Sequence, residues 1–255
     1  MKVDFKKIFP ALTAFIAFIL TLCCLFAGTQ QNLLDGADLL TLYTPEGGAD
    51  SKASAFYSIH VMSYCHGTLE TVEPGSSSSA RNVTECSNRK LLFAFDPTQE
   101  WEDGVSHGPN LEWPRVISDD FHAFRMTTRS MAVMYMIGVG AIGSALVARV
   151  VSLIAPRRQQ GLFEFGFLLF GALSLSVASI IATVIAFEFV DLINAHGDGS
   201  NVSAKYGEKF LGMTWASAGL LLVGSISSFI NVFVRGMQPE PAPAHPKDEE
   251  EGDSD

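Results

Sequence analysis

Four apolar stretches constrain this chain more than any other feature, because each is long enough to cross a lipid bilayer. They cover residues 8–28, 131–155, 162–189 and 210–234. A helix spans the hydrocarbon core with about 20 apolar residues, and lipid admits only helices and closed barrels. Charged residues make up 17% of the chain, against about 25% in soluble domains. The sequence therefore predicts an all-α membrane protein with a four-helix transmembrane bundle.

The remaining segments are predicted to alternate between the two sides of the membrane. They are residues 1–7, 29–130, 156–161, 190–209 and 235–255. Lys and Arg residues near the span ends are more numerous on the side of the termini, which places both termini in the cytoplasm. We therefore expect a multi-pass plasma-membrane protein with two extracellular loops. The Pro-rich and then acidic tail has too few apolar residues to form a core and is expected to be disordered.

The first apolar stretch has two interpretations. Three lysines precede it, as in a secretory signal peptide. It is long for such a peptide, however, and no small-x-small cleavage site ends it. An uncleaved signal anchor is the favoured interpretation and a cleaved signal peptide is the alternative. Both place the following loop on the same side of the membrane.

Two cysteines and a sequon mark the large loop at 29–130. Cys65 and Cys86 are the only cysteines outside an apolar run, and an extracellular location would favour a disulfide between them over two free thiols. Asn82 lies between them in an Asn-Val-Thr sequon, and Asn201 begins an Asn-Val-Ser sequon in the second loop. We therefore predict that the large loop is a small disulfide-stitched β-structured unit. We also predict glycosylation at Asn82 in this loop and at Asn201 in the second loop.

The large loop also contains local structure signals. Alternating apolar residues predict strands over 55–64 and 90–95, which we expect to pair as a hairpin. Residues 73–79 have turn composition and would lie in the connection between these strands. Ser118, followed by two aspartates, is typical of a helix start. That helix is predicted to continue without a break into the second span.

Small residues recur at four-residue spacing in three of the spans, which predicts close helix packing in lipid. The stripes are Gly140/Ser144/Ala148, Ser174/Ala178/Ala182/Ala186, Gly212/Ala216 and Gly224/Ser228. A high content of Gly, Ala and Ser, without any packing role, is the alternative explanation. The favoured interpretation is a packed bundle that also associates laterally through these faces.

No pattern of residues indicates catalysis, a metal site or a cofactor. The six histidines are scattered, and His60 and His66 are interpreted as surface residues. Glu164 and Glu188 are the only acidic residues within the apolar stretches after the large loop, and both are interpreted as interfacial anchors near span ends. A net charge of −10 without a basic face argues against a nucleic-acid partner. We expect a protein that is not an enzyme.

Short motifs, in order along the chain, resemble those of a known family. They are Tyr64-Cys65-His66-Gly67, Cys86-Ser87, Phe95-Asp96-Pro97, and Gly207 followed by Gly212 and Trp215. With four spans and a paired-cysteine first loop, this order resembles the fungal tetraspan family that groups Sur-type eisosome proteins with the pH-response protein PalI. That family is itself claudin-like, although the Trp usual before the first cysteine of claudin loops is absent here.

The resemblance implies a non-enzymatic protein that organises cortical membrane domains of the eisosome type, with roles in cell-wall organisation and endocytosis. The short tail favours the Sur-type branch over PalI. Implied partners are membrane lipids, further copies of the chain or other cortical membrane proteins, and the cell wall. An auxiliary role in ambient-pH signalling is the first alternative, and a channel or transport subunit is the second.

Overall fold

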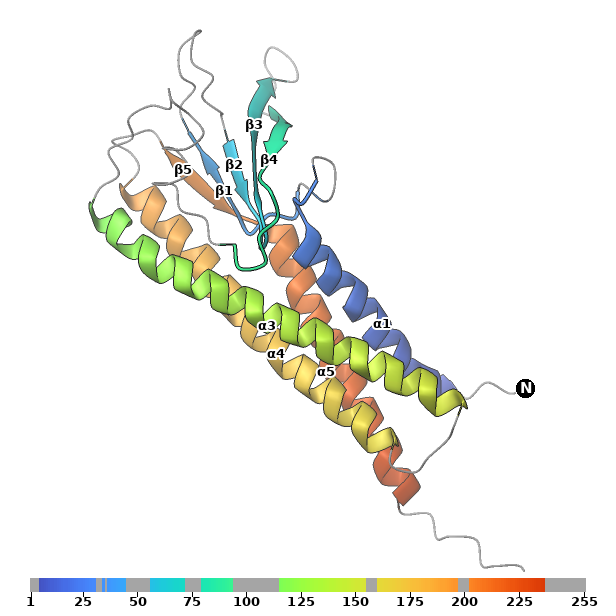
Figure 1. The fold of residues 1–255 in the computed structure, drawn as a ribbon. Coiled ribbons are helices and arrows are strands. Elements are labelled where there is room, and N and C mark those ends of the chain that lie inside the picture. The colour runs from blue at the N-terminus through green and yellow to red at the C-terminus, as the bar shows by residue number, and fades with distance from the viewer. Residues whose placement is uncertain are drawn as a thin grey trace, which may run out of the picture.

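Four long helices form a bundle in the computed structural model, which describes residues 5–30, 34, 36–44, 56–71, 79–93, 115–154, 160–196 and 202–236. They are α1 (Phe5–Phe26), α3 (Arg115–Ile154), α4 (Gln160–His196) and α5 (Glu208–Gly236). Each contains a segment long and apolar enough to cross a membrane. The start of α1 and the end of α5 lie at the same end of the bundle (Figure 1). The predicted four-helix transmembrane architecture is confirmed.

Small residues bring the helices together. Ala178, Ala182 and Ala186 of α4 are fully buried, so this stripe is used within the chain. Gly138 of α3 lies against the side chain of Leu175, and Gly224 of α5 lies against Thr13 of α1. Without a Cβ at these glycines the helix backbones approach closely, and dispersion contacts replace contacts with lipid. The close packing predicted from the stripes is confirmed at these positions.

Five short strands form one antiparallel sheet at the end of the bundle opposite the start of α1 (Figure 1). They are β1 (Leu40–Tyr43), β2 (Phe56–Ile59), β3 (Tyr64–Thr71), β4 (Ser79–Cys86) and β5 (Ser203–Tyr206). Their order is β4-β3-β2-β1-β5. Since β5 comes from the segment between α4 and α5, both polar loops contribute to a single sheet.

The sheet rests on the helix ends through one apolar face. Leu40, Leu42 and Ile59 alternate toward this face and are fully buried in the core that continues into the bundle. The side-chain amide of Asn194 on α4 exchanges two hydrogen bonds with the backbone of Ala204 on β5, at 2.8 and 3.1 Å. These contacts fix the sheet relative to α4.

The predicted pairing of residues 55–64 with 90–95 is wrong. Strand β2 ends at Ile59, a turn follows, and β3 pairs with the polar strand β4. Leu91 and Leu92, whose alternation suggested a strand, are 67% and 49% exposed in a turn. Of the described residues of this segment, 90–93, only Phe93 is buried, beside the ring of Tyr64. The apolar alternation at 90–95 was mistaken for the partner strand. The actual partner, β4, is a polar edge strand, which needs no apolar face and so shows no such alternation.

The predicted helix start at Ser118 is also wrong, because α3 begins at Arg115. The helix does continue unbroken into the second span, as predicted. The third helix extends past the predicted span and ends at His196. Phe95, Asp96, Pro97, Asn201 and the acidic tail lie outside the described residues.

Candidate functional site

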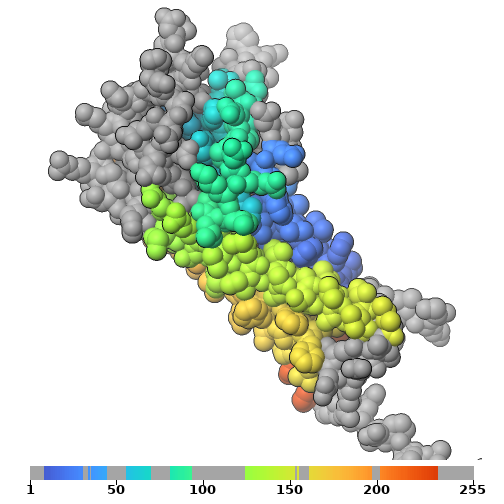
Figure 2. Space-filling model, in the orientation of Figure 1, coloured from blue at the N-terminus to red at the C-terminus, as the bar shows by residue number. Residues whose placement is uncertain are grey.

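The disulfide predicted between Cys65 and Cys86 is present, and it joins β3 to β4. The two cysteines are directly paired in the sheet register, immediately before an irregularity between His66 and Gly67. Strand β4 forms the free edge of the sheet and lies at the molecular surface (Figure 2). An edge strand has hydrogen bonds on one side only, so the disulfide adds a covalent link where the sheet is weakest.

The family motifs around the cysteines have structural roles. Tyr64 donates its backbone N–H to the Ser87 hydroxyl and accepts the Ser87 N–H, at 3.0 and 2.8 Å. A Cβ at Gly67 would overlap the Asn82 carbonyl oxygen, so only glycine fits beside β4. Beside the disulfide lies a polar pocket of about 300 Å³. It is lined by Tyr64, Glu85, Cys86, Ser87, Asn88, Lys90 and Phe93.

The second group of motif residues lies where β5 passes into α5. Gly207 donates its N–H to the Leu39 carbonyl oxygen at 2.9 Å, and a Cβ there would overlap the Asp38 carbonyl oxygen. Trp215 donates its indole N–H to the Thr183 hydroxyl of α4, at 3.0 Å. A Cβ at Gly212 would meet no atom within 4 Å. Gly207 is therefore required by the fold, whereas no neighbour among the described residues explains Gly212.

An arginine on β4 connects strands that are not neighbours. The Arg81 guanidinium lies 5.7 Å from the Phe56 ring centroid and 5.8 Å from that of Tyr43. It donates to the Tyr43 hydroxyl at 2.8 Å and lies 3.6 Å from the carboxylate of Asp38. These cation–aromatic and ionic contacts link β4 to β1 and to Asp38 shortly before it, although β3 and β2 lie between the two strands in the sheet. This cluster could not be predicted from the sequence, because Arg81 is far along the chain from Asp38, Tyr43 and Phe56.

The interpretation of His60 as a surface residue is wrong. His60 is buried where α1 leads into the sheet, and its Nδ1 lies 3.3 Å from the Ala37 carbonyl oxygen. Its ring occupies the space that a Cβ of Gly28 would need, and Gly28 has a φ of +67°. That left-handed conformation favours glycine. His60 therefore packs the junction between α1 and the sheet.

His66 is half-buried between the rings of Tyr57 and Tyr64. Burial lowers the pKa of His66 below its usual 6.5, and the nearby Glu85 carboxylate partly opposes this shift. A lowered folded-state pKa means that the unfolded chain binds the proton more strongly. Stability of the sheet therefore decreases as the pH falls below about 6.5.

This pH dependence can be measured by thermal unfolding of the detergent-purified chain. The measurements run from about pH 7.5 to about pH 5, a range that brackets an ordinary histidine pKa. We expect the melting temperature of the wild type to fall on acidification by more than that of His66→Gln, which lacks the titrating group. Equal pH profiles for both proteins would contradict the assignment.

Glu164, which the sequence suggested as an interfacial anchor near a span end, is one half of a buried ion pair. Its carboxylate lies 3.1 Å from the Arg149 guanidinium, and the Glu164 residue is 6% exposed. The pair joins α3 to α4 at the end of the bundle away from the sheet. A buried charge lowers the stability of the protein when its partner of opposite charge is removed.

Removing one charge of this pair should therefore be more harmful than removing both. We expect Glu164→Gln to lower the stability by about 3 kcal/mol, because it removes the carboxylate that lies 3.1 Å from the partly buried Arg149 guanidinium. The double variant with Arg149→Gln should recover part of that loss. Thermal unfolding of the wild type, both single variants and the double variant measures the difference, and additive losses would contradict the pairing.

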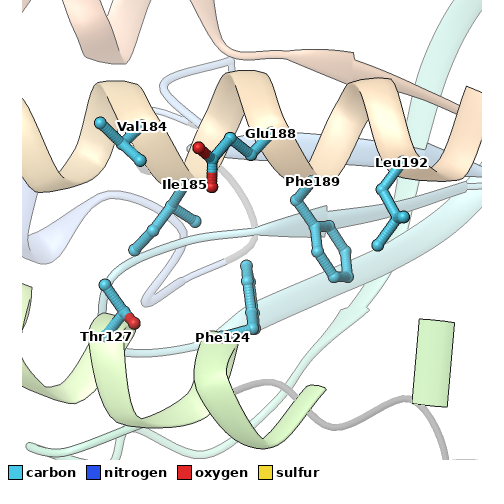
Figure 3. Close-up of a pocket in the computed structure, with 7 residues that line it drawn as sticks. All are labelled: Phe124, Thr127, Val184, Ile185, Glu188, Phe189 and Leu192. Atoms are coloured by element: carbon cyan, nitrogen blue, oxygen red, sulfur yellow. The ribbon is translucent and has the colours of Figure 1, made fainter. Parts of the chain in front are cut away.

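A second pocket, of about 370 Å³, lies between α3 and α4 near the sheet (Figure 3). Phe124 of α3 and Phe189 of α4 face each other there, with ring centroids 4.3 Å apart. The remaining lining residues are Thr127, Val184, Ile185, Glu188 and Leu192. Within the described part of the chain, the structure records no ion pair for Glu188. Glu188 is exposed and is the one charged residue among those that line this pocket.

Among the residues that the structure describes, no three His, Cys, Asp or Glu side chains are grouped so that they could hold a metal ion. Asn82 is exposed on β4. The model of the SUR7/PalI family matches residues 7–227, which include the sheet, the disulfide and most of the four helices. No curated protein matches the chain.

Proposed function

The chain belongs to the SUR7/PalI family of membrane proteins, and on this premise we propose that it organises cortical domains of the fungal plasma membrane, of the eisosome type. In this role it contributes to cell-wall organisation and endocytosis without catalysing a reaction. Both termini are cytoplasmic, the sheet faces the wall, and glycans are carried at Asn82 and Asn201.

The observation that carries this proposal is that the bundle has exposed faces of small residues, which lie on the helices and not on the disulfide-linked sheet. Gly140 and Ser144 of α3 are exposed, as are Gly212, Ala216 and Gly219 of α5. A Cβ at Gly140, Gly212 or Gly219 would meet no atom of the chain within 4 Å. These faces are available for the close helix contacts that small residues permit in lipid. Lateral self-association through them would gather copies into a domain.

A substitution on α5 tests this association without disturbing the monomer. We expect Gly212→Leu to reduce crosslinked dimer in membranes by about fivefold, since the added side chain blocks close approach. Gly166→Leu is the matched control, because Gly166 is exposed on α4 and also has open space around it. Equal dimer yields from the two variants would contradict the use of the α5 face.

The cortical role is tested by live imaging of a C-terminal fluorescent fusion beside a marker of stable cortical domains. Static patches that coincide with the marker are the expected result. An even distribution over the plasma membrane, or retention in internal membranes, would contradict the proposal. Gly212→Leu should show weaker patches, and Gly166→Leu should resemble the wild type.

The alternative role in ambient-pH signalling makes a different prediction. Deletion of the protein would then prevent growth at alkaline pH, whereas an organiser of cortical domains would leave the pH response intact.

A further inference from the structure

The pocket between α3 and α4 lies at the level of the lipid headgroups. Residues 165–187 of α4 contain no charged side chain, and 23 helical residues measure about 35 Å at 1.5 Å per residue. This length matches a hydrocarbon core of about 30 Å. Glu164 ends the charge-free segment on one side and Glu188 on the other. Glu188 therefore lies at the membrane boundary nearest the sheet.

The two acidic residues that bound this segment differ in their surroundings. Glu164 is neutralised by Arg149, whereas no ion pair is recorded for Glu188 among the described residues. Glu188 shares its pocket with the Thr127 hydroxyl, the two phenylalanine rings and three aliphatic side chains (Figure 3). The pocket thus offers one negative charge, carried by the exposed Glu188, beside largely apolar walls.

We propose that this pocket binds the choline headgroup of a zwitterionic phospholipid. The carboxylate complements the positive charge, and aromatic rings beside a carboxylate are a recurrent environment for quaternary ammonium groups. The methyl groups of choline contact the apolar walls without losing hydrogen bonds. The phosphate lies outside the pocket, away from Glu188, and the acyl chains follow the seam of α3 and α4 into the membrane.

Other headgroups fit the lining residues less well. A net anionic headgroup is repelled by Glu188, because all other lining residues are uncharged. An ethanolamine headgroup presents three N–H donors, whose hydration the apolar walls replace poorly. A soluble cation gains nothing from those walls. Headgroup recognition here does not depend on whether the protein gathers in cortical domains.

The test compares lipids bound to the purified full-length chain by native mass spectrometry. The chain is supplied with equal amounts of phosphatidylcholine, phosphatidylethanolamine and phosphatidylglycerol that carry identical acyl chains. We expect the wild type to retain phosphatidylcholine about tenfold over phosphatidylglycerol, and Glu188→Gln to reduce this ratio to about two. Asp191→Asn, the matched control, removes the same charge from an exposed residue outside the pocket and should keep the wild-type ratio.

Three outcomes would overturn the proposal. They are an absence of headgroup preference in the wild type, a stronger retention of phosphatidylethanolamine, and equal effects of Glu188→Gln and Asp191→Asn. Should Glu188→Gln accumulate poorly, Val184→Lys places a positive charge on an exposed wall of the pocket instead and should lower the ratio about threefold. An unchanged ratio in Val184→Lys would then count against the site.

Discussion

Replacing both Cys65 and Cys86 by serine should release β4 from the sheet and leave the four helices assembled. The disulfide closes a loop with a sequence separation of 21 residues, for which the chain-entropy model gives about 3 kcal/mol. The sheet is small and β4 is its polar edge, so this is a large fraction of the local stability. We expect the segment around β4 to become sensitive to protease and the protein to be retained before it reaches the cell surface.

Limited proteolysis of the membrane-extracted protein measures the first effect, and surface biotinylation of intact cells measures the second. Cys23→Ser is the matched control, because Cys23 is a free cysteine within α1. It should leave protease resistance and surface level unchanged. Wild-type resistance in the Cys65→Ser/Cys86→Ser variant would show that the Arg81 cluster and the strand pairing hold β4 without the disulfide.

Gly207→Ala should disrupt the junction of the sheet and α5. The added methyl group would overlap the Asp38 carbonyl oxygen, which belongs to the backbone and cannot move without displacing β1. The same junction carries the hydrogen bond from Gly207 to Leu39 and the pairing of β5 with β1. We expect a loss of about 3 kcal/mol or more, in the range of severe backbone clashes.

The measurement is the melting temperature and monodispersity of the purified protein. Gly212→Ala is the matched control, since it adds the same methyl group in open space, within the first turns of α5. It should behave as the wild type or melt slightly higher, because alanine favours the helix. Equal behaviour of Gly207→Ala and Gly212→Ala would contradict the described junction.

The helices could be predicted from the sequence because lipid imposes a simple requirement. A charge-free run such as residues 165–187 must be helical and must span, whatever its neighbours are. The pairing of Cys65 with Cys86 was also predictable, because each lies outside the spans and no other cysteine does. These inferences depend on local composition rather than on tertiary contacts.

The sheet could not be predicted in the same way, because its strands are short and their partners are distant in the chain. Strand β5 has only four residues, and nothing in its sequence indicates that it pairs with β1. Strand β4 is polar on both faces, so periodicity selected the exposed Leu91 and Leu92 instead. Burial of His60 and pairing of Glu164 with Arg149 likewise follow from tertiary packing.

The central claim is that the disulfide-closed sheet lies outside the cell and that both polar loops contribute to it. Electrophoresis of the membrane-extracted protein, with and without reductant and an N-glycosidase, tests this most directly. We expect a mobility shift from each treatment, and loss of the glycosidase shift in the Asn82→Gln/Asn201→Gln variant. A mobility unchanged by either treatment would contradict the claim.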